Sequence, residues 1–174
     1  MGRLTGQLKS FARKSSGRPQ AVPLRRAVDN ALFLLEQRLR HAGVVVCIDL
    51  SDQELQAWCD ANRLEQVLVN LAGNALDAME GQPAPALDIT ARRQGERILI
   101  QVRDRGPGLS AQARTHLFEP FFTTKEAGSG LGLGLTISAG IVVDFGGSLS
   151  GDNHPDGGAV FTLDLPAAPG EPTP

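Results

Sequence analysis

Four polar or glycine-rich clusters lie between residues 70 and 135 and constrain what this chain can fold into. They are Asn70-Leu-Ala-Gly-Asn74-Ala-Leu-Asp77, Asp104-Arg-Gly106-Pro-Gly108, Phe118-Glu-Pro-Phe-Phe-Thr-Thr-Lys125 and Gly128-Ser-Gly130-Leu-Gly132-Leu-Gly134-Leu135. Each cluster alone is a weak signal, because asparagine pairs and glycine runs are common in proteins. The four in this order predict one nucleotide-binding site.

The composition excludes several classes of protein. The chain has 174 residues, of which 41% are apolar, and a formal net charge of −2. These values fit one soluble globular domain, and the charge favours no polyanion, so nucleic acid is not an expected partner. No stretch approaches the roughly 20 apolar residues that span a bilayer, which predicts a cytoplasmic location. We expect Cys47 and Cys59 to be buried free thiols, rather than a disulfide or a metal site.

Hydrophobic periodicity predicts a chain of mixed helices and strands. The expected helices span residues 3–14, 24–41, 62–79 and 133–145, and the expected strands span 44–50, 55–59, 87–93, 97–103, 148–150 and 159–165. Gly43 should end the second helix, and Asn62 is the expected N-cap of the third. Residues 105–131 are expected to form a long mobile loop, and four prolines from Pro166 onward predict a disordered tail.

The helix expected over residues 62–79 carries a polar flank beside its apolar stripe. At 100° per residue, Asn70, Asn74 and Asp77 gather on one side. A nucleotide-bound Mg²⁺ takes oxygen ligands and keeps several waters, so one amide oxygen from the protein is sufficient. Asn74 is the candidate for that ligand. Alternatively, the asparagines bond only to neighbouring backbone groups.

Glycines are the main feature of the second and fourth clusters. Gly106 and Gly108 would let the backbone beside Asp104 approach a flat ring, although an Asx turn explains the same residues. The glycines from 128 to 134 can place several N–H groups at the start of the last helix, where phosphate oxygens are favoured. No Gly-Lys-Ser/Thr follows them, so this is not a P-loop, and a flexible linker is the alternative.

The expected loop also contains an aromatic cluster. Phe118, Phe121 and Phe122 should anchor the loop to the domain by apolar burial. Lys125 either meets a phosphate when the loop closes or is simply solvated.

Together, the four clusters resemble the N, G1, F and G2 boxes of the ATP-binding domain of sensor histidine kinases, over roughly residues 60–140. The C4-dicarboxylate-sensing and nitrogen-regulatory groups are the most similar. The resemblance implies an α/β (α+β) two-layer sandwich, the Bergerat ATP-binding fold of the GHKL group. A mixed sheet would be covered on one face by three helices, with a mobile ATP lid over residues 105–131. ATP and Mg²⁺ are the implied ligands.

The resemblance also assigns roles to residues. Asp104 would accept a hydrogen bond from the adenine amino group, and Asn70 would orient phosphates or water. Gly130, Gly132 and Gly134 match the three G2 glycines, because Leu135-Thr136-Ile137 then matches the residues that follow. The implied nucleotide-binding residues are Asn70, Asn74, Asp77, Asp104, Gly106, Gly108, Lys125, Gly130, Leu131, Gly132, Leu133, Gly134, Leu135 and Thr136. Asn70 and Asn74 are the implied catalytic residues, with Asn74 as the metal ligand.

A histidine kinase also needs a phosphate-accepting histidine followed by an acidic residue. His41, His116 and His154 all lack that context. The resemblance therefore implies a catalytic domain over residues 19–166, preceded by a remnant of the dimerisation helix (1–18) and followed by a disordered tail (167–174). Its γ-phosphoryl group would pass to a histidine on an absent domain. The parent kinase would be a membrane-bound dimer that serves a response regulator, and this chain alone would be monomeric.

Other activities stay open. In relatives that hydrolyse ATP, such as gyrase-type topoisomerases, the position of Asn70 usually carries a glutamate base, and asparagine cannot act as a general base. This favours phosphoryl transfer to a protein side chain over a self-contained ATP hydrolase. A module that senses nucleotide without transferring phosphate would have the same sequence. Anti-sigma-factor kinases, which phosphorylate serine, fit the Phe-Phe-Thr-Thr-Lys run less well.

Overall fold

The structure is a computed structural model that describes residues 18–50, 54–122 and 133–170. Its centre is a five-stranded sheet with the strand order β2-β4-β5-β7-β6. The strands are β2 (Val45–Leu50), β4 (Ala86–Gln94), β5 (Arg97–Arg103), β6 (Ser148–Asn153) and β7 (Ala159–Pro166). β2 runs parallel to β4 and the other neighbours are antiparallel, so the sheet is mixed.

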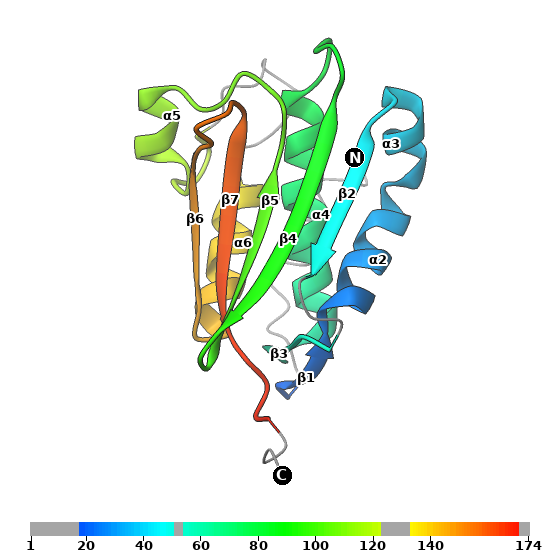
Figure 1. Cartoon of the computed structure of the whole chain (residues 1–174). Coiled ribbons are helices and arrows are strands. Elements are labelled where there is room, and N and C mark those ends of the chain that lie inside the picture. The colour runs from blue at the N-terminus through cyan, green and yellow to red at the C-terminus, as the bar shows by residue number, and fades with distance from the viewer. Residues whose placement is uncertain (1–17, 51–53, 123–132, 171–174) are drawn as a thin grey trace, which may run out of the picture.

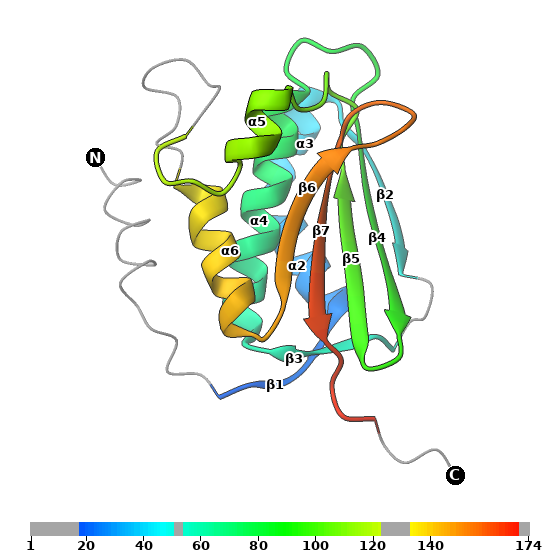
Figure 2. The same cartoon turned by 90° about the vertical axis from the view of Figure 1, so that its left-hand side faces the viewer.

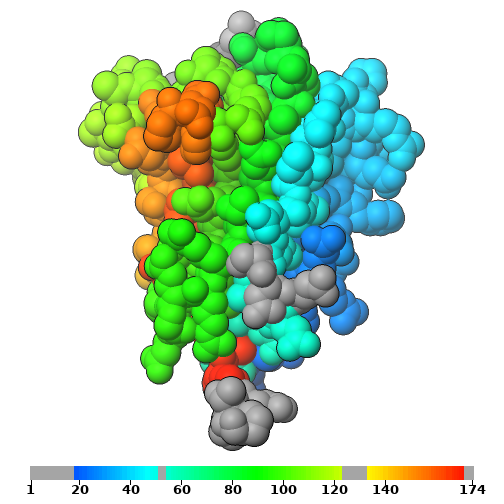
Figure 3. Space-filling model, in the orientation of Figure 1, coloured from blue at the N-terminus to red at the C-terminus, as the bar shows by residue number. Residues whose placement is uncertain are grey.

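Helices α2 (Leu24–Leu34), α4 (Ala61–Ala78) and α6 (Gly134–Asp144) cover one face of this sheet (Figure 1, Figure 2). Successive strand side chains point to opposite faces, so Ile98, Ile100 and Val102 of β5 are buried against the helices. On the other face, side chains of β2, β4 and β5 lie at the surface (Figure 3). The expected two-layer sandwich is confirmed.

A second, two-stranded sheet joins β1 (Gln20–Pro23) to β3 (Gln56–Cys59). β3 agrees with the expected strand over residues 55–59. β1 was not predicted, because four residues are too few to show a periodic pattern.

The chain after β7 is fixed to both sheets. The N–H of Ala167 donates to the carbonyl of Glu96, and the N–H of Ala168 donates to the carbonyl of Gln56, each over 2.8 Å. Ala168 is buried. The expected disordered tail therefore starts too early, because proline content alone does not show that the backbone between prolines finds partners.

The helix expected over residues 24–41 is in fact two helices, α2 and α3 (Glu36–Ala42). Leu35 separates them with φ −104° and ψ 6°, outside the helical region. No glycine or proline marks this position, so the break leaves no local signal. Gly43 ends α3 in the left-handed conformation, as expected.

The N-cap of α4 is Asp60, and the prediction of Asn62 was wrong. The Asp60 carboxylate accepts a hydrogen bond from the backbone N–H of Arg63 over 3.1 Å. A capping side chain must precede the helix to reach the third N–H, whereas Asn62 is already inside the first turn. Among the described residues, no helix combines the length and apolar character that a membrane crossing requires.

The long loop expected over residues 105–131 contains a helix, α5 (Ala111–His116). Ser110 caps it by accepting from the N–H of Ala113 over 3.0 Å. Residues 111–116 are therefore helical, and the sequence did not predict a helix within the long loop.

The two cysteines are free thiols, but only Cys59 is buried. Cys47 is exposed, because its position in β2 places its side chain on the sheet face that carries no helix. The apolar neighbours of Cys47 in the sequence led to the wrong expectation of burial.

Candidate functional site

Asp104 follows the end of β5 and is almost fully buried, with 3% of the residue exposed. Its Oδ1 accepts hydrogen bonds from the N–H groups of Gly106 (2.8 Å) and Ala159 (3.2 Å). Asp104 therefore forms the Asx turn that was the alternative interpretation of this motif. The turn occupies one carboxylate oxygen, and Oδ2 makes no hydrogen bond within the described residues. One fixed acceptor is left for a ligand.

Burial raises the pKa of the Asp104 carboxyl above its ordinary value of 3.8. Hydrogen bonds from Gly106 and Ala159, and the nearby charge of Arg103, act in the opposite direction. A buried carboxylate is penalised because its charged form loses hydration, and each further donor favours that charged form. An N–H group from a ligand would therefore be bound favourably by Oδ2.

Glycines form the walls around Asp104. A Cβ at Gly106 would lie 2.8 Å from the carbonyl oxygen of Ala78, so this loop passes closely over the end of α4. Gly108 has φ +83° and Gly158 has φ +82°, a region that favours glycine. A Cβ at Gly158 would also collide with the carbonyl oxygen of Asp104. A Cβ at Gly106 or at Gly158 would lie 3.2 Å from Oδ1 of Asp104, so side chains at these two positions would crowd the carboxylate.

Asn70 connects α4 to the start of α6. Its Nδ2 donates to the Oγ of buried Ser138 over 2.9 Å, which fixes the orientation of the amide. Its Oδ1 faces the first turn of α6, where a Cβ at Gly134 would collide with it. Within the described residues, no side chain caps this helix end. Its N–H groups therefore remain available to an anion.

Asn74 and Asp77 share the side of α4 that carries Asn70, and both are partly exposed. The Asp77 carboxylate accepts a hydrogen bond from Nη2 of Arg38 on α3 over 2.8 Å. The polar flank predicted from the sequence is therefore a real surface of α4, beside its buried apolar stripe.

The aromatic cluster is only partly buried. Phe118 packs against the core, and its carbonyl accepts a hydrogen bond from Oγ1 of Thr136 over 3.0 Å, which ties this segment to α6. Phe121 is 72% exposed and has φ +65°. The expectation that Phe121 anchors the loop by burial was wrong, because the backbone turns its ring outward.

The glycine cluster is described only at its end. Lys125, Gly130, Leu131 and Gly132 lie outside the described residues. Gly134 begins α6, and Leu133 and Leu135 pack against the core beside it.

Sequence reasoning missed two residues that hold this site together. Ser138 fixes Asn70, and Asn153 clamps Leu109 after the second cluster. The Asn153 side chain accepts from the Leu109 N–H (2.6 Å) and donates to the Leu109 carbonyl (2.9 Å). A serine on a buried helix face is a weak local signal, whereas nothing in the sequence connects Asn153 to a residue 44 positions away.

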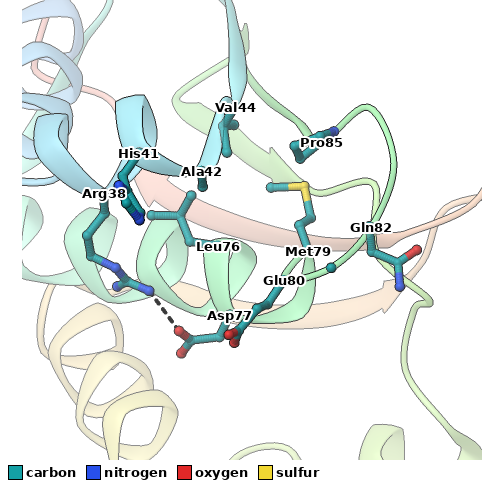
Figure 4. Close-up of a pocket in the computed structure, with 11 residues that line it drawn as sticks. Arg38, His41, Ala42, Val44, Leu76, Asp77, Met79, Glu80, Gln82 and Pro85 are labelled. Carbon is teal, nitrogen blue, oxygen red and sulfur yellow. Dashed lines mark hydrogen bonds and ion pairs between the residues drawn. The ribbon is translucent and has the colours of Figure 1, made fainter.

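A pocket of about 370 Å³ lies beside the C-terminal turn of α4 (Figure 4). Its lining includes Val44, Leu76, Met79 and Pro85, and Arg38 reaches toward Asp77 at its rim. Asp104 and Asn74 do not line it. The pocket is therefore a neighbour of the Asp104 site and not the space in front of that carboxylate.

Comparison with known protein families identifies the class of protein to which this chain belongs. Residues 59–169 match the model of the histidine kinase-, DNA gyrase B- and HSP90-like ATPases. The chain belongs to this family of ATP-binding domains.

Relatives with similar sequences indicate which kind of ATP-binding domain this chain is. The C4-dicarboxylate transport sensor protein DctB of Pseudomonas aeruginosa is 40% identical over 172 residues, which cover 98% of this chain and 28% of that protein. DctB of Rhizobium meliloti is 38% identical over 168 residues, which cover 97% of this chain and 27% of that protein. The chain thus spans about a quarter of the length of these relatives.

Solved structures of histidine kinases superpose on this chain. The catalytic domain of the histidine kinase ThkA superposes with a TM-score of 0.77 at 28% identity, covering 88% of this chain and 100% of that domain. Full-length ShkA in complex with AMPPNP gives a TM-score of 0.82 at 27% identity, covering 98% of this chain and 36% of ShkA. This chain is a histidine kinase ATP-binding catalytic domain, as its four clusters predicted.

Proposed function

We propose that this domain binds ATP together with Mg²⁺ and transfers the γ-phosphoryl group to a histidine on the dimerisation domain of its own kinase. The hydrogen bonding of the Asp104 carboxylate is the observation that best supports this proposal. The buried Asp104 carboxylate has one oxygen held by two backbone N–H groups and the other left for a donor. Such an acceptor, beside backbone without side chains at Gly106 and Gly108, suits the amino group of a flat heterocycle.

The adenine end of the nucleotide is proposed to lie against this carboxylate. Oδ2 of Asp104 would accept a hydrogen bond from the adenine amino group. Gly106 and Gly108 would let the ring approach the loop, and Asn153 would hold the loop in place through Leu109. Base recognition then depends on a fixed acceptor and not on a mobile side chain.

The phosphate end is proposed to lie at the N-terminus of α6. The backbone N–H groups of Gly134, Leu135 and Thr136 open this helix, and the helix dipole favours an anion there. Lys125, Gly130, Leu131, Gly132 and Leu133 are proposed to complete the phosphate site from the segment that precedes the helix.

The residues of α4 suit a magnesium ion bound with the phosphates. Mg²⁺ prefers oxygen ligands and retains waters, so the amide oxygen of Asn74 is a sufficient protein ligand. Asn74 lies one helical turn from Asn70 and on the same side of α4. When bound, the ion would neutralise negative charge on the phosphates. Asp77 is proposed to belong to the same surface.

Transfer then requires positioning more than acid–base chemistry. Asn70 cannot take a proton as a general base, but its amide is held by Ser138 and can orient a phosphate group. The acceptor imidazole is itself the nucleophile: its nitrogen bonds to the γ-phosphorus as the bond to the leaving ADP oxygen breaks. Alignment and charge neutralisation supply the rate for such a step.

We further propose that the whole protein is a membrane-bound dimer that carries this domain in the cytoplasm and passes phosphate to a response regulator. Two comparisons support this proposal. The DctB relatives are described as transport sensor proteins, and ThkA has been solved in complex with the response regulator protein TrrA. The chain by itself is proposed to be a monomer.

The test is to mix this chain with the histidine-bearing segment of its parent kinase and ATP labelled at the γ-phosphate. We expect acid-labile label on the histidine, and no transfer by an Asn70→Ala variant. Steady phosphate release without the added segment would support a hydrolase instead. Nucleotide binding without either reaction would support a sensing module.

A further inference from the structure

Arg38 lies outside the four clusters, yet it contacts the first of them. Its Nη2 donates to Oδ1 of Asp77 over 2.8 Å, from α3 to the C-terminal part of α4 (Figure 4). A Cβ added at Gly73 would lie 3.6 Å from Nη1 of the same guanidinium. The guanidinium therefore extends along the surface of α4 from Gly73 to Asp77.

This stretch of α4 is the turn that carries Asn74. Gly73 immediately precedes Asn74, and Asp77 follows it by three residues, so both project to the same side of Asn74. The positive charge of Arg38 consequently lies beside the side chain proposed to bind magnesium.

Asp77 brings a negative charge to the surface proposed for a polyphosphate. Like charges a few ångströms apart repel appreciably at a protein surface, so an unpaired carboxylate there would oppose ATP. Arg38 balances that charge. Within the described residues, its guanidinium makes no hydrogen bond besides the one to Asp77.

The pair contributes little to folding. The Arg38 side chain is 52% exposed and that of Asp77 is 37% exposed. Ion pairs at this exposure are screened by solvent and have small effects on stability. A large effect of Arg38 on ligand binding would therefore not arise from unfolding.

We infer that Arg38 is a positioning residue for the polyphosphate of the bound nucleotide. It neutralises the Asp77 carboxylate that would otherwise repel the phosphates, so its contribution to affinity grows with the number of phosphates. This inference rests on the proposed nucleotide site.

The test compares Arg38→Gln with Arg40→Gln. Arg40 lies on the same helix and pairs with Glu36 of α3 over 2.6 Å, so its replacement removes the same charge without changing a contact to α4. Each variant is titrated by calorimetry with adenosine, ADP and a non-hydrolysable ATP analogue, all with Mg²⁺. For Arg38→Gln we expect about tenfold weaker binding of the ATP analogue, a smaller loss for ADP and none for adenosine. Arg40→Gln should bind all three as the wild type does.

A double variant separates charge from structure. Arg38→Gln with Asp77→Asn removes both charges, and we expect it to recover most of the lost affinity for the ATP analogue. An equal loss for adenosine and ATP, no loss in Arg38→Gln, or no recovery in the double variant would overturn the inference. Failure of the wild type to bind ADP and the ATP analogue would instead contradict the proposed function.

Discussion

The N–H of Ala159 donates to Oδ1 of Asp104 over 3.2 Å, and the N–H of Asp104 donates to the carbonyl of Ala159 over 3.0 Å. This reciprocal pair fastens the end of β5 to the start of β7. The carboxylate is therefore oriented by the sheet itself. A change in the β6–β7 turn should reach the proposed adenine site through this pair.

Gly158 tests that connection. A Cβ at Gly158 would collide with the carbonyl oxygen of Asp104, whereas a Cβ at Gly157 would meet nothing within 4 Å. Both glycines have positive φ, so alanine at either position is strained by about 1–2 kcal/mol. We predict that Gly158→Ala lowers the free energy of unfolding by at least about 1 kcal/mol more than Gly157→Ala, because only it adds a steric conflict. Urea denaturation measures the difference, and equal effects would contradict the described contact.

The raised pKa of Asp104 predicts a pH dependence of stability. Between the ordinary value of 3.8 and the higher pKa in the folded state, the folded protein holds the proton more firmly than the unfolded chain. The free energy of unfolding therefore falls as the pH rises through this window, and the contribution is lost above the folded pKa. Asp104→Asn should remove this fall, so its stability relative to wild type should increase with pH. Denaturation at a series of pH values tests this, and a constant difference would refute it.

The capping role of Asp60 is testable on its own helix. Asp60→Ala should lower the free energy of unfolding by about 1 kcal/mol, because the N–H of Arg63 loses its partner. Asn62→Ala is the control, since Asn62 is exposed inside the first turn of α4. Chemical denaturation compares the two variants. A larger effect at Asn62 would restore the prediction made from sequence.

The cysteines should differ in reactivity. Burial, with a smaller effect of the Asp60 charge, raises the pKa of Cys59 to about 12, whereas Cys47 is exposed. The thiolate is the reactive form, so iodoacetamide should label only Cys47 in the folded protein at mildly alkaline pH. Both should react after denaturation. Mass spectrometry of the intact chain counts the adducts, and labelling of Cys59 in the folded state would contradict its burial.

The sequence predicted the parts of the site that local pattern determines. Asn70, Asn74 and Asp77 are spaced at the helical period, so the sequence could predict that they share one side of a helix. It could also predict that Asp104 follows a strand. Asp60 and Leu35 were missed, because a cap two residues earlier and a leucine with irregular backbone angles give no distinct signal in the sequence. Ser138 and Asn153 were missed for another reason. Their partners, Asn70 and Leu109, lie 68 and 44 residues away, and only the packing of α6 on α4 and of β6 beside the loop brings them together.

The surface formed by Asn74 on α4 and Asp104 after β5 is proposed to bind ATP together with Mg²⁺. Calorimetric titration of the chain with a non-hydrolysable ATP analogue, with and without Mg²⁺, measures this binding. We predict saturable binding at one site, strengthened by Mg²⁺ in the wild type and much less so in Asn74→Ala. Asp104→Asn should bind at least about tenfold more weakly, because an amide N–H replaces a charged acceptor. Wild-type affinity in both variants, or no binding by the wild type, would contradict a nucleotide site at Asn74 and Asp104.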